Sequence, residues 1–191
     1  MKNLIIHPKD PTTDFLSPIY APLKNKTVIN GGVSKSELRK LIHKHNRVIM
    51  MGHDTPYGLL SVDQFPDIGA HIVDESMAGI LKRKTENIFI WCNADIFVKC
   101  NYLDGLCYGM FLYSEEESIC YGFEDIDRKL IDESNICFAL IMGKYIDEPI
   151  DVLYRNLVFE YGLVAKNNST ARFNFERFRL EINKIIQFLK C

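Results

Sequence analysis

A histidine and a cysteine each follow a run of mainly apolar residues in this chain. His53 follows the run 47–52, and Cys92 follows the run 88–91. A thiol attacks a carbonyl carbon as the thiolate, and a neighbouring imidazole produces that form by taking the proton. The resulting imidazolium can then protonate a leaving amine. The pair therefore predicts acyl transfer, with Cys92 as the nucleophile and His53 as the general base and acid.

An attacked carbonyl also needs hydrogen-bond donors where its oxygen becomes negative. The backbone N–H groups between Gly52 and Gly58, together with the N–H of Cys92, are the donors that the sequence offers. Asp54 follows His53 directly, and its N–H can serve in the same way. The carboxylate of Asp54 would oppose an oxyanion unless it is turned away, because like charges repel strongly in a poorly solvated site.

Each of these residues also has an ordinary structural explanation. A cysteine at a strand end is commonly a buried thiol, and a single histidine is commonly a satisfied core or loop residue. Asp95 could contact a basic substrate side chain, although a helix cap explains it better. The acidic cluster 115–117 could line a pocket for basic residues, although the solvated first turn of a helix is favoured by the helix dipole. Trp91 is expected in the core.

The elements that must position the pair follow from the hydrophobic pattern. Continuous apolar runs over 47–51 and 88–91 predict central parallel strands that are buried on both faces. A helical pattern over 74–84 lies between them and predicts a crossover helix. Since the carboxyl ends of parallel strands meet at one edge of a sheet, we expect His53 and Cys92 to lie close together.

The rest of the chain continues the same alternation. Further strands are expected over 4–6, 27–29 and 109–113, and further helices over 35–45, 125–143 and 148–160. Ser34 and Glu37 form a capping box before the helix 35–45, and the prolines between 8 and 22 predict a loop. The order predicts one α/β domain over 1–191, with an open, mostly parallel sheet flanked by helices. Residues 171–190 are expected to form a helical C-terminal appendage.

Composition and missing motifs exclude several classes of function. The net charge of −2 gives no general attraction to nucleic acid, and no apolar run reaches the about 18 residues that cross a bilayer. No phosphate-binding glycine loop and no clustered Cys and His spacing is present, so neither a cofactor nor a metal is expected. The six cysteines are expected to be reduced, buried thiols of a cytoplasmic protein. The basic stretch 35–47 is explained better by a solvated helix face than by a phosphate site.

Two short motifs carry a family resemblance. VIMMGHDTPYG, residues 48–58, and IFIWCNAD, residues 88–95, resemble the histidine and cysteine motifs of the caspase-like clan of cysteine peptidases. That clan includes caspases, metacaspases, clostripain, gingipains and bacterial CHAT peptidases. The resemblance covers about residues 1–125 by the order of elements, and its specificity lies in the two motifs. It implies the caspase–haemoglobinase fold and an endopeptidase with His53 as base and acid and Cys92 as nucleophile.

The resemblance also bears on regulation. The clan usually has a glycine directly after the histidine, where this chain has Asp54. A catalytically degenerate domain that senses a ligand or acts as a scaffold is therefore the alternative to a peptidase. Small bacterial members of the clan resemble toxins or defence effectors. This implies a protein or peptide substrate and activation by a partner protein or a small signalling molecule.

Overall fold

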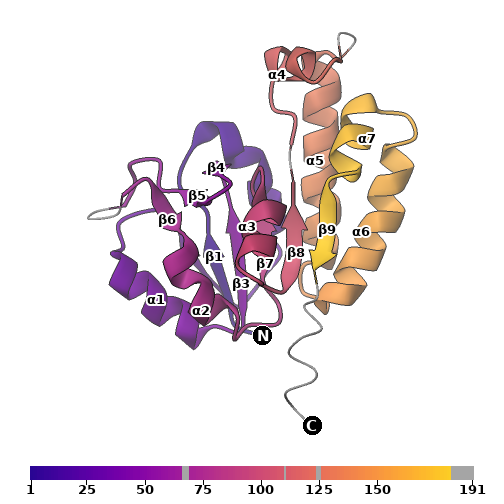
Figure 1. Cartoon of the computed structure of the whole chain (residues 1–191). Coiled ribbons are helices and arrows are strands. Elements are labelled where there is room, and N and C mark those ends of the chain that lie inside the picture. Colours follow the sequence, from indigo (N-terminus) through magenta and orange to yellow (C-terminus); the bar gives the residue numbers. More distant parts are fainter. Residues whose placement is uncertain (66–68, 110, 124–125, 182–191) are drawn as a thin grey trace.

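A six-stranded sheet forms the centre of the computed structural model, which describes residues 1–65, 69–109, 111–123 and 126–181 (Figure 1). The strand order is β2-β1-β3-β7-β8-β9. These strands are β1 (Asn3–Ile6), β2 (Lys26–Ile29), β3 (Arg47–Met51), β7 (Ile88–Ile90), β8 (Gly105–Tyr108) and β9 (Phe178–Glu181). The first five strands run parallel to their neighbours, whereas β9 is antiparallel to β8. The prediction of a mostly parallel α/β sheet is confirmed.

Helices cover both faces of this sheet, as Figure 1 shows. One face packs on α1 (Lys35–Lys44), α2 (Ala78–Leu81) and α3 (Ala94–Cys100). The other packs on the 3-10 helix η1 (Pro11–Ile19) and on α5 (Arg128–Tyr145), α6 (Ile150–Val164) and α7 (Ser169–Phe175). Consecutive strand residues alternate between the two layers, so that Met50 packs on the first and Met51 on the second. Burial on both faces explains why β3 is continuously apolar after its first residue.

A second, smaller sheet lies between β3 and α2 in the chain. It is antiparallel, with the order β4 (Asp54–Thr55), β5 (Gly58–Leu60) and β6 (His71–Val73). Gly58 has φ +148°, and a Cβ there would lie 1.9 Å from the carbonyl oxygen of Val73. Only glycine fits this close approach. These strands are too short for their alternation to be visible in the sequence.

Three expected elements differ in the structure. The proline-rich segment forms η1 rather than a loop, because Asp10 caps it and Pro11 occupies its first turn, where proline is well tolerated. The expected helix 74–84 is reduced to η2 (Glu75–Met77) followed by α2. The expected strand 109–113 is wrong, since β8 ends at Tyr108, and α4 (Glu115–Cys120) begins soon after.

The C-terminal segment was also expected to be helical. Of the range 171–190, residues 171–175 belong to α7, but 178–181 form β9. The helical expectation is therefore wrong for 178–181, because hydrogen bonding to β8 decides their conformation. Residues 182–191 lie outside the described part of the chain.

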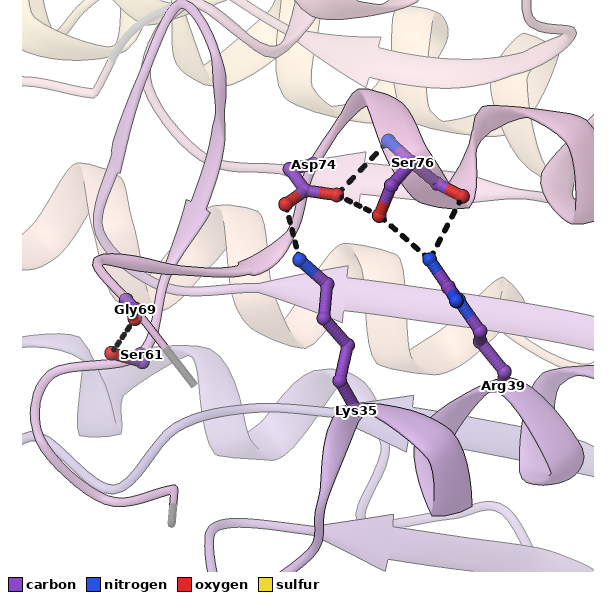
Figure 2. A network of polar contacts seen from close by, with 6 residues as sticks. All are labelled: Lys35, Arg39, Ser61, Gly69, Asp74 and Ser76. Carbon is purple, nitrogen blue, oxygen red and sulfur yellow. Dashed lines mark hydrogen bonds and ion pairs between the residues drawn. The ribbon is translucent and has the colours of Figure 1, made fainter. Parts of the chain in front are cut away.

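The basic stretch 35–47 divides into two environments. Figure 2 shows Lys35 and Arg39 of α1 facing the segment after β6, where Lys35 pairs with the Asp74 carboxylate and Arg39 donates to Ser76 Oγ at 2.9 Å. Arg47 is instead fully buried at the start of β3, so the interpretation as one solvated face is wrong for this residue.

Among the helices described, none is long and apolar enough to cross a membrane.

Candidate active site

The register between β3 and β7 places the two candidate catalytic residues. Met51 pairs with Ile90, and the N–H of Gly52 donates to the carbonyl oxygen of Ile90 at 3.1 Å. His53 and Cys92 each lie two residues beyond the Met51–Ile90 pair, just after the ends of two strands that pair directly and run parallel. Neighbouring strands are about 4.8 Å apart, so the two residues occupy equivalent places at the same edge of the sheet. The prediction that these strands are adjacent and parallel is confirmed.

His53 and Cys92 line the same pocket, which has a volume of about 210 Å³. The pocket lies beyond the carboxyl ends of β1, β3, β7 and β8. Its lining residues are Thr12, Thr13, Phe15, Leu16, Gly52, His53, Ile90, Trp91, Cys92, Phe111, Tyr113, Ser114 and Glu117. In the sheet, β2 lies on one side of β1, and β3, the next strand in the chain, lies on the other side of β1. The strand order therefore reverses between β1 and β3. Ligands of open α/β sheets bind at such a reversal.

The imidazole of His53 is held by the segment that follows β1. Its Nε2 is hydrogen-bonded to Thr12 Oγ1 and lies 3.7 Å from Asp10 Oδ2. Thr12 Oγ1 in turn donates to Asp10 Oδ1 at 2.6 Å. The His53 side chain keeps 41% of its surface exposed, so the ring is anchored on one side and open on the other.

Hydrogen-bond donors and acceptors fix the tautomer of His53. Hydrogen bonds from the hydroxyl and N–H of Thr12 and the nearby His53 lower the pKa of Asp10, against the opposing effect of burial. Asp10 is therefore ionised at neutral pH and only accepts, so the single hydroxyl proton of Thr12 points to it. Thr12 Oγ1 must then accept from His53 Nε2–H, which leaves Nδ1 of His53 as the basic nitrogen.

A second histidine supports this segment from inside the protein. Nε2 of the buried His7 lies 3.2 Å from Thr13 Oγ1, which itself donates to the carbonyl oxygen of Asp10. His7 Nε2–H is therefore the donor to Thr13, and Tyr20 OH donates to His7 Nδ1 at 3.2 Å. Burial lowers the pKa of His7, although the Asp14 carboxylate opposes this. His7 is neutral at pH 7 and has a structural role.

Cys92 lies in a tight turn from β7 into α3. Asn93 adopts a left-handed conformation with φ +60°, which asparagine tolerates, and donates its N–H to Gly109 at 2.6 Å. The Cys92 side chain is half-buried, and none of the five described cysteines forms a disulfide. Cys100 and Cys120 are exposed, so the expectation of buried thiols is wrong for these two. Trp91 is 1% exposed and packs against Phe89, as predicted for a core residue.

The oxyanion donors were expected in the segment 52–58. Gly52 has φ +144°, a conformation that favours glycine, and it turns the chain from β3 into the β4–β5 hairpin. Leu60 N–H donates to the His53 carbonyl at 2.9 Å, so Asp54 and Leu59 form a non-hydrogen-bonded pair. This pairing directs the Asp54 N–H away from β5. The carboxylate of Asp54 lies outside the described part of the chain.

The acidic candidates separate in space. Asp95 lies in the first turn of α3, and its Oδ2 is 3.8 Å from Lys99 Nζ. It does not line the pocket of His53 and Cys92 but a second pocket, which Arg177 and Arg179 also line. The N-cap position of α3 belongs to Asn93, so the interpretation of Asp95 as a cap is wrong. Residues 115–117 form the first turn of α4, as expected, and Glu117 also lines the pocket with His53 and Cys92.

One wall of the pocket is built from a segment with no regular structure. The ring of Phe111 stacks on Tyr108 at 3.8 Å between centroids and meets the edge of Phe15 at 6.0 Å. Its neighbour Leu112 donates its N–H to the side chain of Asn174 at 3.1 Å and accepts at its carbonyl from Asn135 at 3.0 Å. Both asparagines are buried, so polar side chains of α5 and α7 replace the sheet hydrogen bonds of the expected strand.

Asp10 and Thr12 contact His53 but were not among the candidate residues predicted from the sequence. Their signal was present, because an aspartate followed by a proline is typical of an N-cap and the first turn of a helix. A helix that starts just after β1 begins at the edge of the sheet where β3 and β7 also end.

The described residues contain no group of three or more His, Cys, Asp or Glu side chains that could hold a metal ion. No protein-family model, curated protein or solved structure matches this chain.

Proposed function

We propose that this chain is a caspase-like cysteine endopeptidase that uses a dyad of His53 and Cys92. The observation that carries the proposal is their placement two residues beyond a registered pair on adjacent parallel strands, in one shared pocket. A thiol and an imidazole at such a site are the minimum that nucleophilic acyl transfer requires. The two motifs and the mostly parallel, helix-covered sheet agree with the caspase–haemoglobinase fold that the resemblance implies.

The proposed reaction follows from the tautomer of His53. Nδ1 of His53 takes the proton from Cys92 Sγ, and the thiolate attacks the scissile carbonyl carbon. The N–H groups of Asp54 and Cys92 stabilise the oxyanion of the tetrahedral intermediate. The imidazolium then gives its proton to the leaving amine, and a thioester to Cys92 remains. Water, deprotonated by His53, attacks the thioester and releases the carboxylic acid and the free thiol.

The pocket suits a side chain of a protein or peptide substrate. Its walls include the apolar side chains of Phe15, Leu16 and Phe111, and Glu117 contributes a carboxylate. Apolar walls bind the body of a substrate residue, while a few polar groups orient it. Asp54 beside His53 suggests a low basal rate that an activating partner protein or small signalling molecule raises.

Labelling with a peptidyl electrophile tests the dyad. The full chain is treated with a peptidyl acyloxymethyl ketone, and the modified residue is assigned by mass spectrometry. We expect modification at Cys92, abolished in Cys92→Ala and slowed about 10²-fold or more in His53→Ala. Cys100→Ala is the matched control, because this thiol is exposed and lies outside the pocket. Modification of Cys100 or Cys120 in preference to Cys92 would contradict the proposal.

The alternative is a catalytically degenerate domain that binds a ligand in the same pocket. The replacement of the usual glycine by Asp54 is the observation that favours it. On this hypothesis Cys92→Ala retains the biological effect of the protein, whereas a peptidase loses it. Comparison of Cys92→Ala with the wild type in the cell therefore separates the two functions.

A further inference from the structure

We propose that Asp10 and Thr12 are positioning residues that hold His53 in the tautomer and orientation needed for catalysis. This inference rests on the proposed function, and it assigns a role to two residues upstream of both motifs. Asp10 and Thr12 lie 43 and 41 residues before His53 in the sequence, and η1 brings them to the same edge of the sheet.

The contacts form one chain of hydrogen bonds that ends at the imidazole. Asp10 Oδ1 accepts from Thr12 Oγ1 at 2.6 Å, and Thr12 Oγ1 is hydrogen-bonded to His53 Nε2. Each group has one arrangement available: the carboxylate only accepts, the hydroxyl donates once, and Nε2 must supply the remaining proton. Nδ1 is left unprotonated, which is the state that a base acting on Cys92 needs.

A helix cap alone does not account for Asp10. The cap uses Oδ1, which accepts the Thr12 N–H at 2.8 Å. The second oxygen, Oδ2, has no part in that bond and lies 3.7 Å from His53 Nε2. This distance lets the carboxylate stabilise the imidazolium that forms when His53 takes the thiol proton. Oδ1 therefore serves the turn and, through the Thr12 hydroxyl, the imidazole, whereas Oδ2 takes no part in the cap and lies near the imidazole.

The segment that anchors His53 is itself held by buried contacts. His7 holds Thr13 from the buried side, and Thr13 donates to the backbone of Asp10. Leu16 and Ile19 of η1 are buried in the core against α5. A positioning group needs such support, because a misplacement of about 1 Å can cost about 10² in rate.

Three variants separate positioning from folding. Thr12→Val removes the hydroxyl but keeps the shape and the N–H that Asp10 caps. Thr12→Ser restores the hydroxyl, and Asp10→Asn keeps a good N-cap while it removes the charge. We expect kcat for a peptide substrate to fall about 10²-fold in Thr12→Val and about tenfold in Asp10→Asn, with KM unchanged. Thr12→Ser should restore most of kcat.

A spectroscopic readout keeps the inference independent of turnover. The ¹⁵N chemical shifts of the His53 ring should report the Nε2–H tautomer in the full wild-type chain, and a mixture of tautomers in Thr12→Val. The same tautomer ratio in Thr12→Val as in the wild type, or unchanged kcat in an active enzyme, would overturn the positioning role. If the tautomers change as expected but the wild type cleaves no peptide and Cys92 is not labelled, the positioning role stands and the peptidase proposal fails.

Discussion

The N–H of Gly52 donates to the carbonyl oxygen of Ile90 at 3.1 Å, at the carboxyl end of the β3–β7 pair. His53 is the next residue after Gly52, and Cys92 follows Ile90 by two positions. This hydrogen bond therefore ties the two chain segments together directly before both candidate residues. The proposed dyad would follow directly on the ends of two paired strands, and such support favours precise geometry.

Replacement of Asp54 tests whether its charge restrains the proposed peptidase. On this hypothesis we expect Asp54→Gly to raise the basal rate of peptide cleavage about 5- to 150-fold, since a carboxylate that stays near the oxyanion and is poorly solvated would raise the barrier by roughly 1–3 kcal/mol. Asp54→Asn is the matched control for the charge, because it keeps a side chain of the same size. Equal basal rates for the wild type and both variants, measured without an added partner, would show that the carboxylate does not act on the reaction.

Glu117 is the acidic residue whose position in the pocket allows it to affect specificity. We expect Glu117→Gln to lower kcat/KM for peptides with Lys or Arg in this pocket about three- to fivefold relative to neutral peptides, since partly exposed charge pairs contribute at most about 1 kcal/mol. Glutamine keeps an acceptor for the Tyr113 N–H, which Glu117 binds at 2.8 Å. Glu116→Gln is the control, because Glu116 is exposed and does not line the pocket. The prediction fails if both variants change selectivity equally.

The stability of the fold should fall as the pH drops below about 6.5, in part through His7. Burial lowers the pKa of His7 from the ordinary value of 6.5, so the unfolded chain binds a proton at a higher pH than the folded chain does. The unfolded state therefore holds more protons in this range, and the free energy of unfolding decreases as the pH falls. Urea unfolding at pH 7.5 and 5.5 should show a smaller decrease in His7→Gln than in the wild type. An equal decrease in the two proteins would assign the effect to other groups.

Arg47 should be a strong determinant of stability. It is fully buried at the start of β3, donates to the carbonyl oxygen of Glu148 at 2.6 Å and to that of Ile146, and pairs with Glu86. We expect Arg47→Met to reduce the free energy of unfolding by about 3 kcal/mol, because it leaves buried acceptors without a donor. Glu86→Gln keeps an acceptor for the Arg47 guanidinium at a partly exposed position, so it should cost clearly less than Arg47→Met. Denaturant titration of both variants measures the difference, and similar costs would refute the assignment.

Local sequence patterns determined much of the central architecture. The continuous apolar runs over 48–51 and 88–91 were predicted to be adjacent parallel strands, and this is confirmed for β3 and β7, because a strand buried on both faces favours apolar residues. The capping box of Ser34 and Glu37 was predicted from two residues and is formed in the structure. Candidate residues His53 and Cys92 followed from the ends of those strands, since strand ends in one sheet share an edge.

Tertiary contacts decided the rest. The conformation of 178–181 depends on pairing with β8, about 73 positions away in the chain, and the backbone of Leu112 bonds to Asn135 and Asn174 rather than to a strand. Thr12 meets His53 across 41 positions. Hydrophobic periodicity reports only which face of an element is buried, whereas the partner of a hydroxyl, an amide or a strand edge is set by the packing of distant elements. The sequence alone therefore predicted the candidate pair, and only the folded chain showed which residues contact His53.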